Sequence, residues 1–348
     1  MTHQQITSAI RKEINAHYKA FKEKFPVLKY QNFWGFLIFF ISIAVVTLTS
    51  ILWWKSIVPT WLLIIINAFF FGVLHELEHD LIHWMYFKNN KIIHHGMLLT
   101  VWLLRPLTIN PWIRRQLHYH HHKYSGTLHD VEERGVTNGE KWSIKRFLFT
   151  PDLVIGGLLR VNSLFKDIKR EMKDGRLKME LGNQLKRNAV LGLIPVTILS
   201  HVILYVFVLM GVLQWFNFSF LEESAFLLGL QNVLNFLQPY IYIILLPNVL
   251  RQFCLHFITS NIHYFADVEE GNVIEQTQVL NVWWTFPFHI FCFFFGWTHA
   301  IHHFVVQETF YVRHLTRKKA QEVLKDYGVR FNDLGTFRRA NRFHELEQ

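Results

Sequence analysis

Residues 33–54 read FWGFLIFFISIAVVTLTSILWW, a run of 22 residues without a charged side chain. Wound as a helix, such a run is long enough to cross the hydrocarbon core of a bilayer, which is about 30 Å thick. It is too long for a cleavable secretion signal, and no small-residue cleavage site follows it, so we expect a permanent membrane anchor. This stretch places the chain among integral membrane proteins.

Three further apolar runs predict three more membrane-spanning helices. They lie at about residues 56–74, at residues 189–213 and at residues 225–250. Only a few residues separate the first two runs of the chain, so these form a hairpin, and residues 214–224 join the last two into a second hairpin. The shorter apolar pieces at residues 92–104 and 282–297 are expected to lie at the membrane surface. We therefore expect an all-α integral membrane protein with about four transmembrane helices in two hairpins.

The chain carries a formal charge of +10, and the positions of its 36 lysines and arginines agree with this topology. All of them except Lys55 fall in three polar segments, at residues 1–32, 75–188 and 251–348. Basic residues stay on the cytoplasmic side of a membrane, so we expect both termini and both large polar segments to be cytoplasmic. The charge is thus a topology signal. Since no module that reads bases or a nucleic-acid backbone is visible, we expect no nucleic acid as a partner.

Three segments follow from this topology. We expect a cytoplasmic N-terminal segment at residues 1–32, a membrane domain with interfacial helices and a cytoplasmic histidine-rich cap at residues 33–315, and a cytoplasmic tail at residues 316–348. In the tail, Thr316 is placed to cap a helix over residues 317–327, and Gly328 is placed to end it.

The residue types available for metal binding are histidines rather than cysteines. The chain has 21 histidines but only two cysteines, Cys254 and Cys292, both in or beside apolar segments. Two such cysteines form neither a disulfide framework nor a CxxC metal site, which indicates a reducing setting. Any metal must therefore be held by nitrogen and oxygen.

Nine histidines fall into four groups, each in a cytoplasmic segment beside an apolar run. The groups are His75 and His79; His118, His121 and His122; His263; and His299, His302 and His303. Residues three and four apart share one face of a helix, so the larger groups each present three imidazoles together, while His120 points away. One ion takes about four to six ligands, and nine convergent imidazoles suit two ions. Imidazole accepts zinc, copper, iron or nickel, so the ligand type alone does not choose the metal.

Other polar residues near these groups have different expected roles. Four acidic residues are placed to accept the second ring N–H of a ligand histidine: Asp80, Asp130, Glu132 and Glu133. The isolated histidines His201, His256 and His289 are interpreted as packing residues. The pair His94–His95 lacks a third partner on its face, and the sequence does not decide its role.

The histidine groups resemble the three histidine boxes of the membrane fatty acid desaturase and hydroxylase superfamily. The pattern HxxxH, HxxHH and HxxHH falls on the first, second and last groups in order, and residues 121–130, HHKYSGTLHD, also resemble the family. The resemblance covers roughly residues 33–315 and implies that His263 is the extra ligand between the second and third boxes. It further implies two non-haem irons, dioxygen as co-substrate, a fatty acyl lipid as substrate, and a separate electron donor.

The reaction outcome stays open at this stage. After the third box the chain reads FVVQETFY at residues 304–311, where the commonest desaturases have a short segment with a leucine and a proline. His263–Tyr264 resembles the corresponding site in alkane hydroxylases, but those have a longer spacing in the second box. Desaturation is the expected reaction, with hydroxylation and oxidative decarboxylation to a terminal alkene as alternatives. No electron-donor domain is visible, so the resemblance implies an external ferredoxin, rubredoxin or cytochrome.

Two other classes of function explain less of the sequence. A metal transporter would place ionisable ligands within its spans, where only His201 lies deep. A bis-histidine haem protein needs two facing histidines and leaves the two HxxHH groups unexplained.

Two sets of residues are placed to contact an acyl substrate. Aromatic residues near Trp283, Trp284, Phe288 and residues 293–295 would line a tunnel for the chain, or would only anchor the protein at the interface. Arg105, Arg114 and Arg115 would hold a carboxylate or phosphate head group, or would only reflect the bias of basic residues toward the cytoplasm.

Overall fold

A computed structural model describes residues 1–137, 139–150, 152, 155, 166–177, 196–216 and 224–344. Four helical stretches in it are long and apolar enough to cross a membrane. They are α2 (Gln31–Trp54), α3 (Thr60–Ile82), α10 (Val196–Trp215) and a continuous stretch over Ala225–Ile262. This confirms the prediction of an all-α, multi-pass membrane protein. The first residues of the predicted third span, 189–195, lie outside the described part of the chain.

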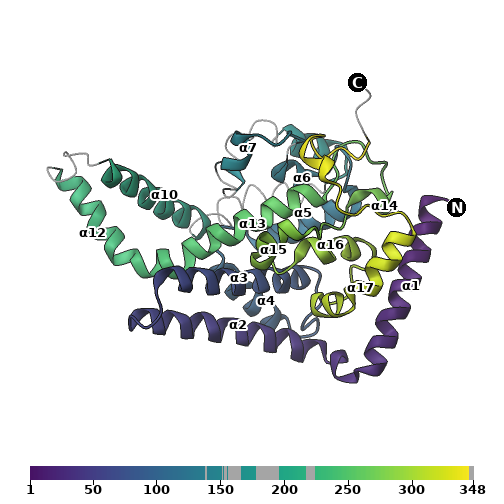
Figure 1. Cartoon of the computed structure of the whole chain (residues 1–348), viewed down its shortest axis with the longest axis horizontal. Helices are drawn as coiled ribbons and strands as arrows, with labels where there is room; N and C mark the ends of the chain where they lie inside the picture. The colour runs from purple at the N-terminus through teal and green to yellow at the C-terminus, as the bar shows by residue number, and fades with distance from the viewer. Residues whose placement is uncertain are drawn as a thin grey trace.

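The fourth stretch consists of three pieces. It begins as α12 (Ala225–Tyr240), continues through the π-helical turn η2 (Ile241–Leu245), and ends as α13 (Leu246–Ile262). Pro239 lies inside α12 just before the turn, where its missing N–H disturbs the regular hydrogen-bond ladder. Figure 1 shows α10 and α12 extending together away from the rest of the molecule, while α13 lies beside α3.

The first hairpin is tied together by polar contacts between its helices. At the turn, the indole of Trp53 donates to the hydroxyl of Thr60 at 3.0 Å. Deeper in the hairpin, the Thr49 hydroxyl donates to the side-chain oxygen of Asn67 at 2.7 Å, and the Asn67 amide donates to the Ile243 carbonyl at 3.1 Å. The second bond reaches η2, so Asn67 joins α2, α3 and the fourth stretch.

α3 and α13 extend beyond the apolar runs that predicted them. The second apolar run was expected to end at residue 74, but α3 continues to Ile82, and α13 continues to Ile262, next to His263. Both spans therefore carry polar, chemistry-bearing residues at their ends. Two short helices, α5 (Pro111–Tyr124) and α16 (Phe295–Phe304), gather at these ends (Figure 1).

The segments expected at the membrane surface are both helical. α4 (Lys91–Leu104) is one short apolar helix that packs on α3. Residues 282–297 instead form three pieces: the 3₁₀ turn η3 (Trp283–Thr285), α15 (Phe286–Phe291) and the start of α16. Phe293 and Phe294 between them have positive φ, 47° and 56°, which breaks the helix and lets α16 turn back toward the bundle.

The N-terminal and C-terminal segments fold together as part of the cap. α1 (His3–Lys24) packs along α17 (Phe310–Asp326), as Figure 1 shows, with Ile10, Ile14 and Val323 in one buried cluster. The prediction that Thr316 caps the last helix was wrong. The helix begins at Phe310, seven residues earlier than expected, and the Thr316 hydroxyl donates to the Val312 carbonyl within it at 2.7 Å. The predicted stop is confirmed, because α17 ends before Gly328, whose φ is +85°.

Gly72 gives a test of the packing between α3 and the end of α15. A Cβ at Gly72 would lie 2.5 Å from the backbone carbonyl oxygen of Phe291, which is closer than packed atoms tolerate. We expect Gly72→Ala to destabilise the protein by about 1–3 kcal/mol, the usual cost of overpacking. Thermal unfolding in detergent measures the effect.

Gly211 on α10 supplies the matched control. A Cβ at Gly211 meets nothing within 4 Å, so Gly211→Ala is expected to leave stability unchanged or slightly raised, since alanine favours the helix. Equal melting temperatures for the two variants would contradict the close approach of α3 to Phe291.

Candidate metal centre

Nine buried or half-buried histidines gather in two adjoining groups at the ends of α3, α5, α13 and α16. In each group, one ring nitrogen from every member lies within 4.8 Å of the others. Group one consists of His79, His83, His118, His122 and His302, and group two consists of His121, His263, His299 and His303. The groups adjoin, because the rings of His122 and His303 lie 4.9 Å apart between centroids.

Each HxxHH box contributes to both groups. On α5, His118 and His122 enter group one while His121 enters group two; on α16, His302 enters group one while its two partners enter group two. Residues three and four apart share a face but differ in direction by a fraction of a turn, which separates them between two neighbouring centres. The two groups are therefore held on shared, rigid helices.

Local sequence signals set the position of α5. The side chain of Asn110 caps the helix by accepting from the backbone N–H of Trp112 at 2.9 Å, and Pro111 occupies the first helical position, which suits its missing N–H. Beyond the helix, Gly126 has φ +83° and packs against Val268, where any side chain would collide. This turn brings Asp130 back toward α5.

The ring nitrogens within each group face one another at short distances. In group one, Nε2 of His118 lies 2.9 Å from Nε2 of His79 and 3.0 Å from Nε2 of His122. In group two, Nε2 of His299 lies 2.8 Å from Nε2 of His263 and 3.1 Å from Nε2 of His303. A neutral imidazole has only one N–H, so hydrogen bonds among the rings cannot satisfy all of these contacts.

Acceptors outside the groups fix the direction of the ring lone pairs. A carboxylate accepts from Nδ1 of His118, namely Glu132 at 3.0 Å, and another accepts from Nδ1 of His121, namely Asp130 at 2.7 Å. With the proton held on Nδ1, the Nε2 lone pair points into the group. Converging lone pairs repel one another unless a cation lies between them, so the donor set of each group fits a metal ion.

Two more histidines of group two face acceptors of this kind. Nδ1 of His303 lies 3.2 Å from the side-chain oxygen of Gln276, and Nδ1 of His263 lies 3.0 Å from the Thr259 carbonyl and 3.5 Å from Glu133. His263 follows the last residue of α13 in an extended conformation, which turns its ring toward α16. The resemblance had placed His263 between the second and third boxes, and the structure brings it into group two.

Burial keeps most of these imidazoles in the neutral form that metals bind. Removal from water lowers the pKa of His83 to about 3 and that of His263 to about 4. Burial also acts to lower the pKa of His121, but the carboxylates of Asp130, Glu132 and Glu133 outweigh it and raise this pKa to about 9. A metal ion that binds at group two must therefore displace a proton from His121.

The structure does not bring His75 into either group. Nη1 of Arg105 lies 2.9 Å from Nδ1 of His75, and a guanidinium can only donate, so His75 accepts at Nδ1 and carries its proton on Nε2. His75 is therefore set apart by position, because it is not among the residues whose ring nitrogens converge in either group. His83 joins group one instead, one turn beyond His79 at the end of α3.

Sequence reasoning missed His83 and Arg313. The pattern HxxxH fits two overlapping pairs, because histidines stand four residues apart at His75, His79 and His83. Only the earlier pair was assigned as ligands from the sequence. Arg313 on α17 lies 2.6 Å from Nδ1 of His302 and 3.3 Å from Asp80. Asp80 was expected to face a ligand histidine, but it accepts from the Phe310 backbone N–H at 2.9 Å and so ties α17 to α3.

The other histidines that the sequence analysis discussed lie outside both groups. Each has another contact: His94 contacts the Tyr86 carbonyl, His95 contacts the Trp112 indole, His201 contacts the Thr197 carbonyl, His256 contacts the Thr150 carbonyl, His120 packs on the Tyr124 ring, and His289 packs on Trp297. They are packing or hydrogen-bonding residues in this structure.

Comparison with protein families agrees with this geometry. The model of the family described as fatty acid desaturase matches residues 56–335, most of the chain, including all nine grouped histidines. The chain belongs to the fatty acid desaturase family. Membership of this desaturase family makes the chain an oxidoreductase of fatty acyl lipids and confirms the resemblance seen in the histidine boxes. Comparisons with curated proteins and with solved structures found no significant match.

The choice between His75 and His83 is open to a direct test. We expect His83→Ala to lower the metal content of the purified protein, because group one loses a donor, and His75→Ala to leave the content unchanged. Elemental analysis of both variants beside the wild type provides the measurement. A loss of metal in His75→Ala with full content in His83→Ala would refute this ligand assignment.

The carboxylate of Asp130 should matter for metal affinity although it is not a ligand. Asp130→Asn keeps the size of the side chain but removes the charge that holds the proton on Nδ1 of His121, so we expect affinity at group two to fall about 10–100-fold. Titration with a competing chelator measures this. Asp174→Asn, on a partly exposed carboxylate that pairs with Arg176, is the control and should leave affinity unchanged.

Proposed function

We propose that the chain uses dioxygen and two non-haem irons to oxidise an unactivated C–H bond of a fatty acyl chain, with desaturation as the outcome. The observation that carries the proposal is the pair of adjoining histidine groups at the end of α3 and at the end of the stretch Ala225–Ile262, both of which are long enough to span a membrane. The proposed ligands are His79, His83, His118, His122 and His302 for one ion and His121, His263, His299 and His303 for the other.

Iron suits both the donor set and the reaction. Imidazole nitrogen is an accepted ligand of iron, and no described cysteine lies in either group. A methylene group has no acidic proton and no polar handle, so acid–base side chains cannot open its C–H bond. Bound iron supplies the oxygen chemistry that can.

The residues of the chain itself orient the site and exclude water. The carboxylates of Asp130 and Glu132 fix two of the imidazoles, and Arg313 holds α17 over His302. Phe295 stacks on the ring of His299 with 4.2 Å between centroids. Among the aromatic residues expected to line a substrate tunnel, Phe295 is in contact with a grouped histidine, whereas the side chain of Trp283 is 84% exposed.

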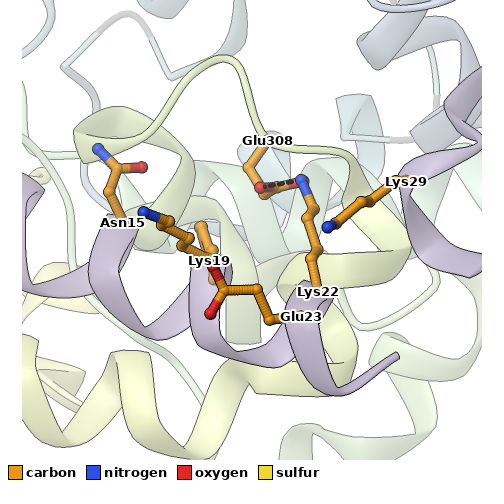
Figure 2. A pocket seen from close by; sticks show the side chains of 7 residues that line it. Asn15, Lys19, Lys22, Glu23, Lys29 and Glu308 are labelled. Atoms are coloured by element: carbon orange, nitrogen blue, oxygen red, sulfur yellow. Dashed lines mark hydrogen bonds and ion pairs between the residues drawn. The ribbon is translucent and has the colours of Figure 1, made fainter. Parts of the chain in front are cut away.

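We further propose that the metal centre and both termini face the cytoplasm, where a ferredoxin, rubredoxin or cytochrome delivers electrons. The bias of lysine and arginine supports this orientation. Figure 2 shows Lys19, Lys22 and Lys29 around a pocket between α1 and Glu308, with Lys22 paired to Glu308 at 2.7 Å. The backbone carbonyl of Glu308 accepts a hydrogen bond from Arg313, and Arg313 also contacts His302. Glu308 and Arg313 thus connect the lysines around this pocket to group one.

Product analysis tests the proposed reaction. Cells that express the chain and receive fatty acids should form an oxidised acyl product, expected to contain an internal double bond, and His122→Ala should abolish it. His201→Ala is the matched control, because His201 is buried but belongs to neither group and bonds the Thr197 carbonyl, and product should persist. Product formation by His122→Ala equal to wild type would refute the assignment of the site.

A hydroxylated product, or an alkene one carbon shorter, would correct the outcome but keep the oxidase function. The purified protein should contain about two irons per chain and lack a haem absorption band. A haem band, or the absence of iron from an active protein, would overturn the proposal.

A further inference from the structure

Three arginines from different elements meet on the membrane side of the candidate metal centre. Arg105 follows α4, Arg114 lies on α5 and Arg251 lies on α13; the side chains of Arg105 and Arg251 are fully buried. Glu78 on α3 forms ion pairs with Arg105 and, at 2.7 Å, with Arg114. One carboxylate thus serves two of the three guanidinium groups.

Arg251 has no acidic partner among the described residues. Its Nε donates to the side-chain oxygen of Asn248 at 3.3 Å, its Nη2 donates to that of Gln252 at 3.4 Å, and its Nη1 has no hydrogen-bond partner within the described part of the chain. Glu76 on α3 pairs with Arg313 on the far side instead, at 3.7 Å. A buried charge without a counter-ion is costly, so the site calls for an anion.

Two other buried donors beside Arg251 also lack partners among the residues that the structure describes. The amide nitrogen of Gln252 has none, and neither has Nε2 of His75, which carries the proton because Nδ1 accepts from Arg105. Arg251 lies within electrostatic range of His75 and of Arg105. Unpartnered donors and an excess of positive charge therefore occur together between α3 and α13.

The anion site borders group two of the metal centre. The ring of His75 lies 5.7 Å from that of Phe295, which stacks on His299 at 4.2 Å. Arg251 itself lies twelve residues before His263 on the same membrane-spanning stretch, about 18 Å along a helix. A ligand that binds here sits inside the bundle, within the length of a fatty acyl chain of the metals.

We propose that Arg251, together with Gln252 and His75, binds the carboxylate of a free fatty acid, which deepens the proposed function by naming the substrate class. A guanidinium pairs with a carboxylate through two parallel N–H bonds, and the pair is strong where water is excluded. A free acid brings only this small charged group and an apolar chain that can arrive from the lipid. A phospholipid or nucleotide-thioester head group is too large and too hydrated for a fully buried site.

Binding of the carboxylate at Arg251 would determine which carbon of the acyl chain is oxidised. With the head group held at Arg251 and the metals fixed by the helices, the distance from the carboxyl carbon to the oxidised carbon is set by the protein. The position of oxidation, counted from the carboxyl end, is therefore the same for acids of different length.

Binding to the purified, metal-loaded protein in detergent tests the proposal without turnover. The probes are radiolabelled saturated acids from octanoate to stearate and the methyl ester of each. The wild type should bind at least one acid about tenfold or more tightly than its ester, since the ester lacks the charge. Arg251→Met should reduce acid binding by a similar factor and leave ester binding unchanged, and Arg251→Lys should recover part of the loss.

Arg317→Met is the matched control, because Arg317 stacks on Trp297 at the surface of α17 and should not affect binding of either probe. Metal content reports whether each variant is folded. Equal binding of acid and ester by the wild type would overturn the proposal even if every Arg251 variant failed to fold. Full acid affinity in a folded Arg251→Met would also overturn it.

The binding result separates this inference from the proposed function. A protein that binds the acid through Arg251 but oxidises no acyl chain would refute the oxidase function and leave the carboxylate site in place. A protein that oxidises acyl esters as well as acids, with no effect of Arg251→Met on binding, would refute the carboxylate site and leave the oxidase function in place.

Discussion

The fold around the two histidine groups depends on the repulsion between imidazole lone pairs and on the cations that relieve this repulsion. Nine histidines bring ring nitrogens within 4.8 Å of one another in two buried groups, with several Nε2 pairs near 3 Å. Burial removes water as a partner, and the carboxylates behind His118 and His121 hold the protons on Nδ1, so the inward nitrogens are the ones that can bind a cation. Cations stabilise such an arrangement, so folding of the cap and binding of metal are thermodynamically coupled.

The helices around the two groups hold the histidines in position. α3 and α13 carry histidines at the ends of membrane-spanning helices, and the short helices α5 and α16 each contribute to both groups. The terminal helices α1 and α17 close the cap, with Arg313 joining α17 to both Asp80 and His302. The metal centre thus depends on residues more than two hundred positions apart in the chain.

The sequence predicted the features that depend on local composition and spacing. Uncharged runs predicted all four spans, because a bilayer requires that length whatever the neighbours are, and the two HxxHH boxes predicted six grouped histidines. The choice between His75 and His83 depends on which ring nitrogens converge in the folded chain, because both pairs have the same HxxxH spacing in the sequence. In the same way, the start of α17 at Phe310 depends on a bond to Asp80 across the fold, which helix-capping signals near Thr316 do not reveal.

The central claim is that the two histidine groups hold one iron each, and anomalous scattering measured at the iron absorption edge tests it most directly. On a crystal of the purified protein we expect two peaks, one among the five nitrogens that include His83 and one among the four that include His263. A single peak, a peak bound by His75, or no iron signal at either group in an active protein would contradict the account.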